Sequence, residues 1–179
     1  MKTTLHRITL MALGALLVCA VGSRAQAPAA ESTPATAAFE RLKALTGKWE
    51  ATRDDGRKVY KTFEVTAGGS AVTEKYEEAG RPHMTMFTVF YLEGRDLVLN
   101  HYCVAKNQPR MRAEKISASG DDVQFLFTGA TNLASTDAGH MYRAVYQFHS
   151  GGEFSSAWTY RQGGQDRFTE SNRFRRATD

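Results

Sequence analysis

From Gly47 to the end of the chain, short segments rich in Val, Phe, Tyr, Thr and Trp alternate with turn residues at nearly regular intervals. Each segment has the length of a strand, and no apolar period typical of a helix occurs among them. The turns contain Gly, Pro, Asn and Asp, which tight connections between antiparallel strands prefer. The turn signals are Asp54-Asp55-Gly56, Gly68-Gly69, Ala79-Gly80-Arg81-Pro82, Gly94-Arg95, Asn107-Gln108-Pro109, Ser119-Gly120-Asp121, 132–139, Gly151-Gly152 and Gly163-Gly164.

These turns separate ten segments, which predict an all-β fold: a single up-and-down antiparallel β-barrel of about ten strands. A two-sheet sandwich is the structural alternative. Upstream of the strands, Phe39, Leu42 and Leu45 recur at three-residue spacing, and Thr36 is a suitable N-cap residue. We therefore expect a short N-terminal helix from Thr36 to Leu45 that caps one end of the barrel.

A Gly-Xaa-Trp sequence marks the start of the first expected strand. Gly47 lets the backbone turn out of the preceding helix without a Cβ clash. Trp49, two residues later, then points inward and fills one end of the barrel with a large apolar ring. A buried Trp at the start of any strand gives the same pattern, so the motif supports a barrel only together with the strands that follow it.

Residues 1–27 have the pattern of a secretory signal peptide. A basic start precedes an apolar run over residues 8–21, and small residues follow, so cleavage is expected after Ala27 or Ala25. The apolar run is too short to span a membrane. We therefore expect an exported protein, periplasmic or secreted, with no transmembrane segment in its mature form.

The remaining chain divides into a tether and one domain. Residues 28–38 are rich in Ala, Pro, Ser and Thr, which predicts a disordered tether, and residues 39–176 form the barrel domain. Cys19 lies in the expected signal peptide, which leaves Cys103 without a partner in its own chain. Stability must therefore come from a packed core, which a domain of about 140 residues can supply.

The charge of the chain changes when the signal peptide is set aside. The full sequence has 23 Lys and Arg against 19 Asp and Glu, but three basic residues and no acidic ones lie in residues 1–27, which leaves 20 against 19. The remaining arginines are scattered along the chain rather than clustered. This pattern lacks the basic surface that nucleic-acid binding requires, so we expect no nucleic-acid partner.

The layout resembles the calycin group, that is, the lipocalins and their smaller relatives. The resemblance is carried by Gly47-Lys48-Trp49 after a short helix and by Arg173, Arg175 and Arg176 on the last strand. It implies that one of these arginines lies across the Trp49 ring and that a ligand binds inside the barrel. The domain is thus interpreted as a lipocalin-like barrel.

Two departures narrow the resemblance. The chain ends almost as soon as the last strand does, whereas a classical lipocalin continues into a helix, and Asp54-Asp55-Gly56-Arg57 is a turn where fatty-acid-binding barrels have a helical lid. The nearest layouts are the lidless ten-stranded nitrobindin-like haem proteins and uncharacterised secreted bacterial lipocalin-like proteins. Haem is therefore an alternative cofactor, while the main expectation is a protein without one.

The interior wall follows from hairpin pairing. A two-residue turn at Gly94-Arg95 pairs Phe90 with Leu99, Thr88 with His101 and Met86 with Cys103. A five-residue loop through Pro109 then places Met111 opposite Cys103. The face expected to line the interior comprises Met84, Met86, Thr88, Phe90, Leu99, His101, Cys103, Met111 and Ala113. The other face carries Asn100, Tyr102, Arg112 and Glu114, and a slip of one residue would exchange the two faces.

We expect this wall, together with Trp49, to bind a small hydrophobic or amphipathic molecule. Met and Phe side chains supply apolar contact area, and His101 supplies one polar group. Ordinary core packing of the same residues is the main alternative, because Met and lone Cys are common gap-filling core residues.

Three further interpretations remain open. Met86, Cys103 and Met111 beside His101 are soft donors that suit copper(I) or an axial position of haem. An enzyme would use Cys103 and His101, but residues two apart on a strand lie about 7 Å apart, beyond hydrogen-bonding reach, and we expect a binder rather than an enzyme. A ligand-free structural module would dimerise through an exposed strip of Phe87, Val89 and Tyr91, so the protein is expected to be a monomer or a homodimer.

Overall fold

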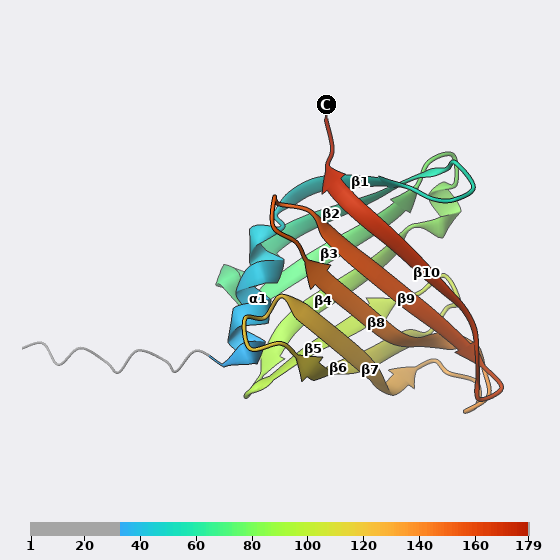
Figure 1. Cartoon of the computed structure of the whole chain (residues 1–179). Coiled ribbons are helices and arrows are strands. Elements are labelled where there is room, and N and C mark those ends of the chain that lie inside the picture. Colours follow the sequence, from blue (N-terminus) through green and yellow to red (C-terminus); the bar gives the residue numbers. More distant parts are fainter. Residues whose placement is uncertain (1–32, 179) are drawn as a thin grey trace, which may run out of the picture. The chain divides into compact units, whose positions relative to one another are not determined.

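The structure, a computed structural model, describes residues 33–178 as a closed antiparallel β-barrel of ten strands with one α-helix (Figure 1). The elements are α1 (Pro34–Ala44), β1 (Gly47–Thr52), β2 (Lys58–Thr66), η1 (Ala67–Gly69), β3 (Ala71–Glu78), η2 (Pro82–Met84), β4 (Met86–Glu93), β5 (Asp96–Tyr102), β6 (Gln108–Ile116), β7 (Asp122–Thr131), β8 (His140–Phe148), β9 (Phe154–Gln162) and β10 (Gln165–Arg176). Each strand pairs with its neighbours in sequence, and β10 closes on β1. The predicted up-and-down barrel is confirmed, and the two-sheet sandwich is wrong.

The N-cap of helix α1 lies three residues earlier than the sequence analysis predicted. Thr33, not Thr36, is the N-cap: its hydroxyl accepts the backbone N–H of Thr36 at 3.2 Å, and the Thr36 hydroxyl accepts the N–H of Thr33 at 2.7 Å. This reciprocal capping box makes residues 34–38 helical, so the predicted disordered tether is wrong over that stretch. Residues 1–27, the predicted signal peptide, and 28–32, the rest of the tether, lie outside the described residues.

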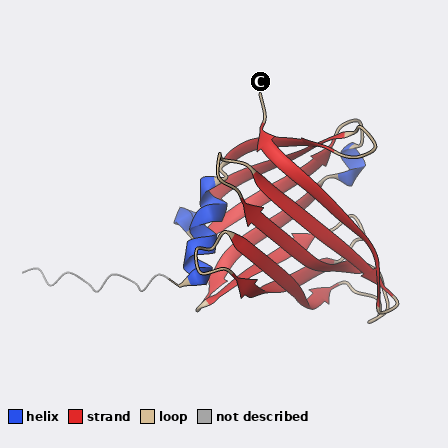
Figure 2. Cartoon of the chain, in the orientation of Figure 1, coloured by secondary structure: helices blue, strands red, loops and turns tan. Residues whose placement is uncertain are grey.

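Helix α1 caps one end of the barrel, as predicted. Its buried face consists of Ala35, Ala38, Phe39 and Leu42, and it packs against β2, β4, β5 and β6. Figure 2 shows α1 at one end of the barrel and the short 3₁₀ helix η2 at the opposite end. Among residues 33–178, no helix combines the length and apolar character needed to cross a bilayer.

The barrel closes at the α1 end around a buried tryptophan. The indole N–H of Trp49 donates to the carbonyl oxygen of Leu45 at 2.6 Å. The guanidinium carbon of Arg176 lies 4.1 Å from the centre of the Trp49 ring, and its nitrogens donate to the carbonyl oxygens of Thr46 and Ala44. The predicted inward Trp and the arginine that crosses it are therefore both confirmed, and the arginine is Arg176.

Replacing Gly47 by Ala is expected to destabilise this corner more than the same change in an open turn. Gly47 has φ +115°, and a Cβ there would lie 2.5 Å from Nη1 of Arg176. The backbone conformation alone costs an alanine about 1–3 kcal/mol, and displacing Arg176 from Trp49 adds to that cost. The measurement is urea denaturation of Gly47→Ala, with Gly56→Ala as control because Gly56 has φ +79° and open space around it. Equal losses in the two variants would contradict the packing role of Gly47.

The hairpin of β4 and β5 has the predicted register. Phe90 lies opposite Leu99, and Thr88 lies opposite His101. All four side chains are buried, whereas Tyr102, on the face predicted to point outward, is half exposed. The predicted inward face of this hairpin is therefore confirmed.

The connection from β5 to β6 is shorter than predicted. Met111 lies opposite Leu99, so the expected pair of Met111 with Cys103 is wrong. Cys103 follows the last residue of β5 and donates its N–H to the carbonyl oxygen four residues later, in a tight turn where Lys106 has φ +63°. Cys103 is thus also outside the β4–β5 ladder that was expected to pair it with Met86. The register differs by four residues, an even number, so Met111 still points inward.

Most of the barrel interior is filled by the chain's own side chains. Phe154 is central to this core, because it contacts Trp49, Phe63, Tyr146 and Phe174 through ring centroid distances of 5.0–6.4 Å. The side chains with almost no exposed surface include Val59, Phe63, Phe90, Leu97, Leu99, Met111, Phe125, Tyr146, Phe154 and Phe174. Space for a ligand is therefore confined to what this core leaves free.

Candidate ligand-binding cavity

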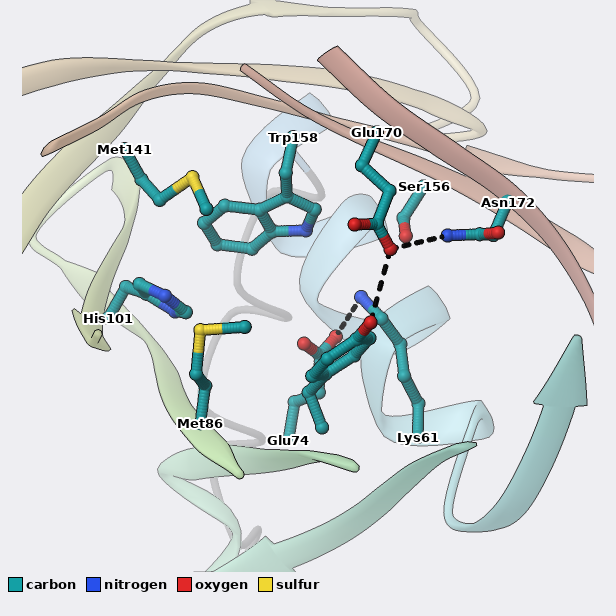
Figure 3. Close-up of a pocket in the computed structure, with 10 residues that line it drawn as sticks. Lys61, Glu74, Met86, His101, Met141, Ser156, Trp158, Glu170 and Asn172 are labelled. Carbon is teal, nitrogen blue, oxygen red and sulfur yellow. Dashed lines mark hydrogen bonds and ion pairs between the residues drawn. The ribbon is translucent and has the colours of Figure 1, made fainter. Parts of the chain in front are cut away.

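A small cavity lies between strands on opposite sides of the barrel (Figure 3). Its volume is about 40 Å³. It is lined by Lys61, Glu74, Tyr76, Met86, His101, Met141, Ser156, Trp158, Glu170 and Asn172. A cavity of this size holds a few water molecules, whereas pockets for drug-sized ligands have roughly 300–1,000 Å³. It therefore accepts only a very small ligand or one end of a longer one.

His101 presents an unpartnered nitrogen to this cavity. Its Nδ1 is hydrogen-bonded to the hydroxyl of Thr88 at 2.9 Å, and its ring lies 4.7 Å from the ring of Trp158. Its Nε2 is buried without a hydrogen-bond partner. Burial lowers the pKa of His101 to about 3, and the ammonium of Lys61 contributes to the shift. The imidazole is therefore neutral at physiological pH, with one open bonding position.

A buried ion pair lies on the other side of the cavity. Nζ of Lys61 donates to Oε2 of Glu74 at 2.9 Å and to the hydroxyl of Tyr146 at 3.2 Å, and this hydroxyl donates to the same Oε2 at 2.6 Å. The Lys61 and Glu74 side chains are 3% and 2% exposed. Burial lowers the pKa of Lys61, against the opposing effect of the Glu74 carboxylate, and burial also raises the pKa of Tyr146. The three groups form a closed hydrogen-bonded ring that fixes β2, β3 and β8 to one another.

Glu170 separates the cavity from the outside of the barrel. Its Oε1 accepts hydrogen bonds from the hydroxyl of Tyr76 at 3.1 Å and the amide of Asn172 at 3.0 Å. Its Oε2 accepts a charged hydrogen bond from Arg53 at 2.7 Å. Burial, followed by the Glu170 charge, raises the pKa of Tyr76. Both carboxylates that line the cavity are thus engaged by protein groups.

A wider cleft of about 530 Å³ adjoins the cavity and shares Glu170 and Asn172 with it. The cleft is lined by Arg53, Asp54, Asp55, Glu78, Arg81, Met84, Phe168, Thr169, Glu170, Ser171 and Asn172. It lies where the barrel is least tightly closed, because β1 pairs with β10 at only two positions, at the α1 end of the seam. The ion pair of Arg53 with Glu170 joins the turn after β1 to β10 at this seam, where the cleft and the cavity meet.

The structure brings together only part of the predicted ligand-binding wall. Met86 and His101 line the cavity, and Thr88 holds His101. The remaining predicted residues lie elsewhere: Trp49, Phe90, Leu99 and Met111 in the filled core, Met84 in the outer cleft, and Cys103 in the turn after β5. The predicted row of Met86, Cys103 and Met111 beside His101 is thus not formed around this cavity.

The enzyme interpretation requires a hydrogen bond between the Cys103 thiol and the His101 imidazole. Among the described side chains no hydrogen bond joins them, and Nδ1 of His101 is engaged by Thr88. Burial raises the pKa of the Cys103 thiol, which lowers the fraction of reactive thiolate. The nucleophile and base that the enzyme interpretation requires are therefore not assembled here.

The sequence analysis missed the residues from β2, β3, β8, β9 and β10. They are Lys61, Glu74, Tyr76, Met141, Ser156, Trp158, Glu170 and Asn172. A signal for one of them was present: Val59, Lys61 and Phe63 alternate along β2, and the two apolar residues point inward. The period of two therefore places Lys61 on the inner face as well.

No protein-family model matches the chain, and a search of curated proteins finds no significant match. The closed ten-stranded antiparallel barrel is compatible with a calycin-like fold. The fold and the cavity together define the class of protein: a closed ten-stranded antiparallel barrel with a mostly filled interior and a small cavity that combines apolar side chains with an open imidazole nitrogen.

Proposed function

We propose that the protein binds a small amphipathic molecule in this cavity, with its polar atom hydrogen-bonded to Nε2 of His101. The observation that carries the proposal is the buried Nε2 without a partner. Such an atom costs free energy that a ligand recovers when it supplies the missing hydrogen bond. Met86, Met141 and Trp158 line the same cavity and supply apolar contacts for the rest of the ligand.

The polar group of the ligand is expected to be neutral. The imidazole of His101 is uncharged, and the carboxylates of Glu74 and Glu170 are already engaged by Lys61 and Arg53. A charged ligand would therefore enter a buried site without a free partner of opposite charge. A hydroxyl or an amide N–H meets the requirement, because each can donate to Nε2 when Nδ1 of His101 donates to Thr88.

The length of the ligand determines how far it extends from the cavity. A few atoms fit within about 40 Å³, and a longer molecule would pass Glu170 into the adjoining cleft. Met84 lines that cleft together with Phe168, which is 52% exposed and offers apolar contact area. A haem is larger than the cavity, so the haem alternative would require side chains around it to move.

The cellular setting of the proposal rests on the sequence. The signal-peptide pattern of residues 1–27 supports export and a periplasmic or secreted location. Phe87, part of the strip expected to support a dimer, is 40% exposed on the outside of β4. A measurement of the protein's mass in solution distinguishes a monomer from a homodimer.

Loss of the imidazole is expected to weaken binding of a small alcohol about 10–100-fold, because one buried hydrogen bond is lost. The probes are ethanol, a very small ligand, and n-octanol, which can insert its hydroxyl end, and binding is followed by tryptophan fluorescence and native mass spectrometry. The test variant is His101→Phe. The matched control is His149→Phe, because His149 lies in the turn after β8 and its Nε2 is already hydrogen-bonded to Ser155 of β9. Binding that is unchanged in His101→Phe, or absent from the native protein, would contradict the proposal.

A further inference from the structure

We infer that the same cavity binds a soft monovalent metal ion, Cu(I), between the thioether sulfurs of Met86 and Met141 and Nε2 of His101. The inference goes beyond the organic ligand proposed above and does not depend on it. It starts from three donor-bearing side chains that come from different strands, β4, β8 and β5, and line one cavity. In Figure 3 all three lie in the left part of the view beside the Trp158 ring, with Met141 above the ring and Met86 and His101 below it.

The donor set selects a soft ion. Thioether and imidazole are the ligands that Cu(I) prefers, whereas hard cations prefer carboxylate and carbonyl oxygens. Nε2 of His101 lines the cavity and has no partner. The proposed site uses the tautomer in which Nδ1 donates to the hydroxyl of Thr88, because Nε2 then carries a free lone pair. The hydrogen bond from Nδ1 is also the kind of support that orients a metal-binding histidine.

Harder metals have no comparable site in this part of the chain. Within residues 33–178, no group of three or more His, Cys, Asp and Glu side chains is arranged to hold a metal ion. The two carboxylates of the cavity are occupied by Lys61, Tyr146, Tyr76, Asn172 and Arg53. A divalent ion would have to displace these partners, whereas Cu(I) needs only the free donors.

Size and charge also suit a monovalent ion. A cavity of about 40 Å³ accommodates an ion without moving the core. The charged side chains at the cavity are Lys61, Glu74 and Glu170 with its partner Arg53, which sum to zero, so a monovalent ion adds half the unpaired charge that a divalent ion would add. The ring of Trp158 lies 4.7 Å from the ring of His101, so an ion on Nε2 lies near an aromatic face that attracts cations.

The test is an anaerobic titration of the exported protein with Cu(I) against the competing chelator bicinchoninate, together with native mass spectrometry. We expect one tightly bound Cu(I) per chain and quenching of tryptophan fluorescence. The double variant Met86→Leu, Met141→Leu keeps the apolar volume but removes both sulfurs, and it should bind Cu(I) about 100-fold more weakly. Met84→Leu is the matched control, because Met84 lines the outer cleft and not the cavity.

Two further measurements make the outcome decisive. Cys103→Ser should keep the affinity, because Cys103 does not line the cavity, and loss of binding in that variant would move the site to the thiol and overturn the inference. Unchanged affinity in the double Leu variant, no binding by the native protein, or stronger binding of Zn(II) would overturn it as well. Binding of n-octanol by a native protein that does not bind Cu(I) would overturn this inference alone, and binding of Cu(I) by a native protein that does not bind n-octanol would contradict the organic ligand alone, so the two proposals fail independently. Circular dichroism of each variant verifies that the barrel is intact.

Discussion

Replacing Lys61 by Met is expected to lower the free energy of unfolding by about 3–5 kcal/mol, because it leaves the carboxylate of Glu74 buried without its cationic partner. Glu74 is 2% exposed and has only the hydroxyl of Tyr146 as a remaining partner. The length of Met is close to that of Lys, so loss of packing contributes little. Urea denaturation at pH 7, followed by tryptophan fluorescence, gives the difference.

The matched control removes the charges together. In the triple variant Lys61→Met, Glu74→Leu, Tyr146→Phe, no polar group of the ring stays buried without a partner, so stability should return to within about 1–2 kcal/mol of the native protein or exceed it. Lys75→Met should change stability little, because Lys75 and its partner Glu77 are both exposed. A triple variant as unstable as the single one would show that Lys61 acts through packing rather than charge.

The architecture was predictable because it depends on local signals. Turn residues such as Gly94 and Gly163 occupy positive φ in the structure, and they mark the hairpins that make the barrel. Trp49 and Arg176 were recognisable from their places on the first and last strands. The start of α1 was not predicted, because Thr33 and Thr36 are both acceptable caps and only the reciprocal hydrogen bonds distinguish them.

The register after β5 was mispredicted because the turn carries no glycine. Lys106 adopts φ +63°, a conformation that side-chain-bearing residues rarely take, so nothing in the sequence places the turn there. Pro109 suggested a loop, but it lies within β6 and pairs with Ala130 of β7. The predicted register of β6 against β5 was wrong by four residues, an even number, so the same side chains of β6 still point inward.

The cavity was only half predictable because it forms between strands far apart in sequence. The β4–β5 hairpin supplied His101 and Met86, and local pairing was enough to place them on the inner face. Lys61, Met141 and Trp158 reach the same cavity only through closure of the barrel. A lysine on a strand is ordinarily exposed. The buried ion pair becomes evident only in the folded barrel, where Glu74, diagonal to Lys61 on the neighbouring strand, accepts its hydrogen bond.

The stability of the metal-free protein is expected to fall by about 3 kcal/mol between pH 7 and pH 4 through His101 alone. Burial lowers the pKa of this imidazole from 6.5 to about 3. The unfolded chain therefore takes up a proton at His101 below pH 6.5, whereas the folded chain does so only near pH 3. This contribution to stability is fully present above pH 6.5 and is lost progressively as the pH falls towards 3.

The measurement is the free energy of unfolding in urea at half-unit intervals of pH, for the native protein and for His101→Phe. Lys61, Glu74, Tyr76 and Glu170 face the same cavity and remain in both proteins, so the difference between the two curves isolates His101. His101→Phe lowers the absolute stability by leaving the hydroxyl of Thr88 without its partner, but it should flatten the curve between pH 6.5 and pH 4. His149→Phe should keep the native slope. Parallel curves for the native protein and His101→Phe would mean that the imidazole accepts a proton inside the folded barrel, and the cavity would then be open enough to water to hydrate a cation.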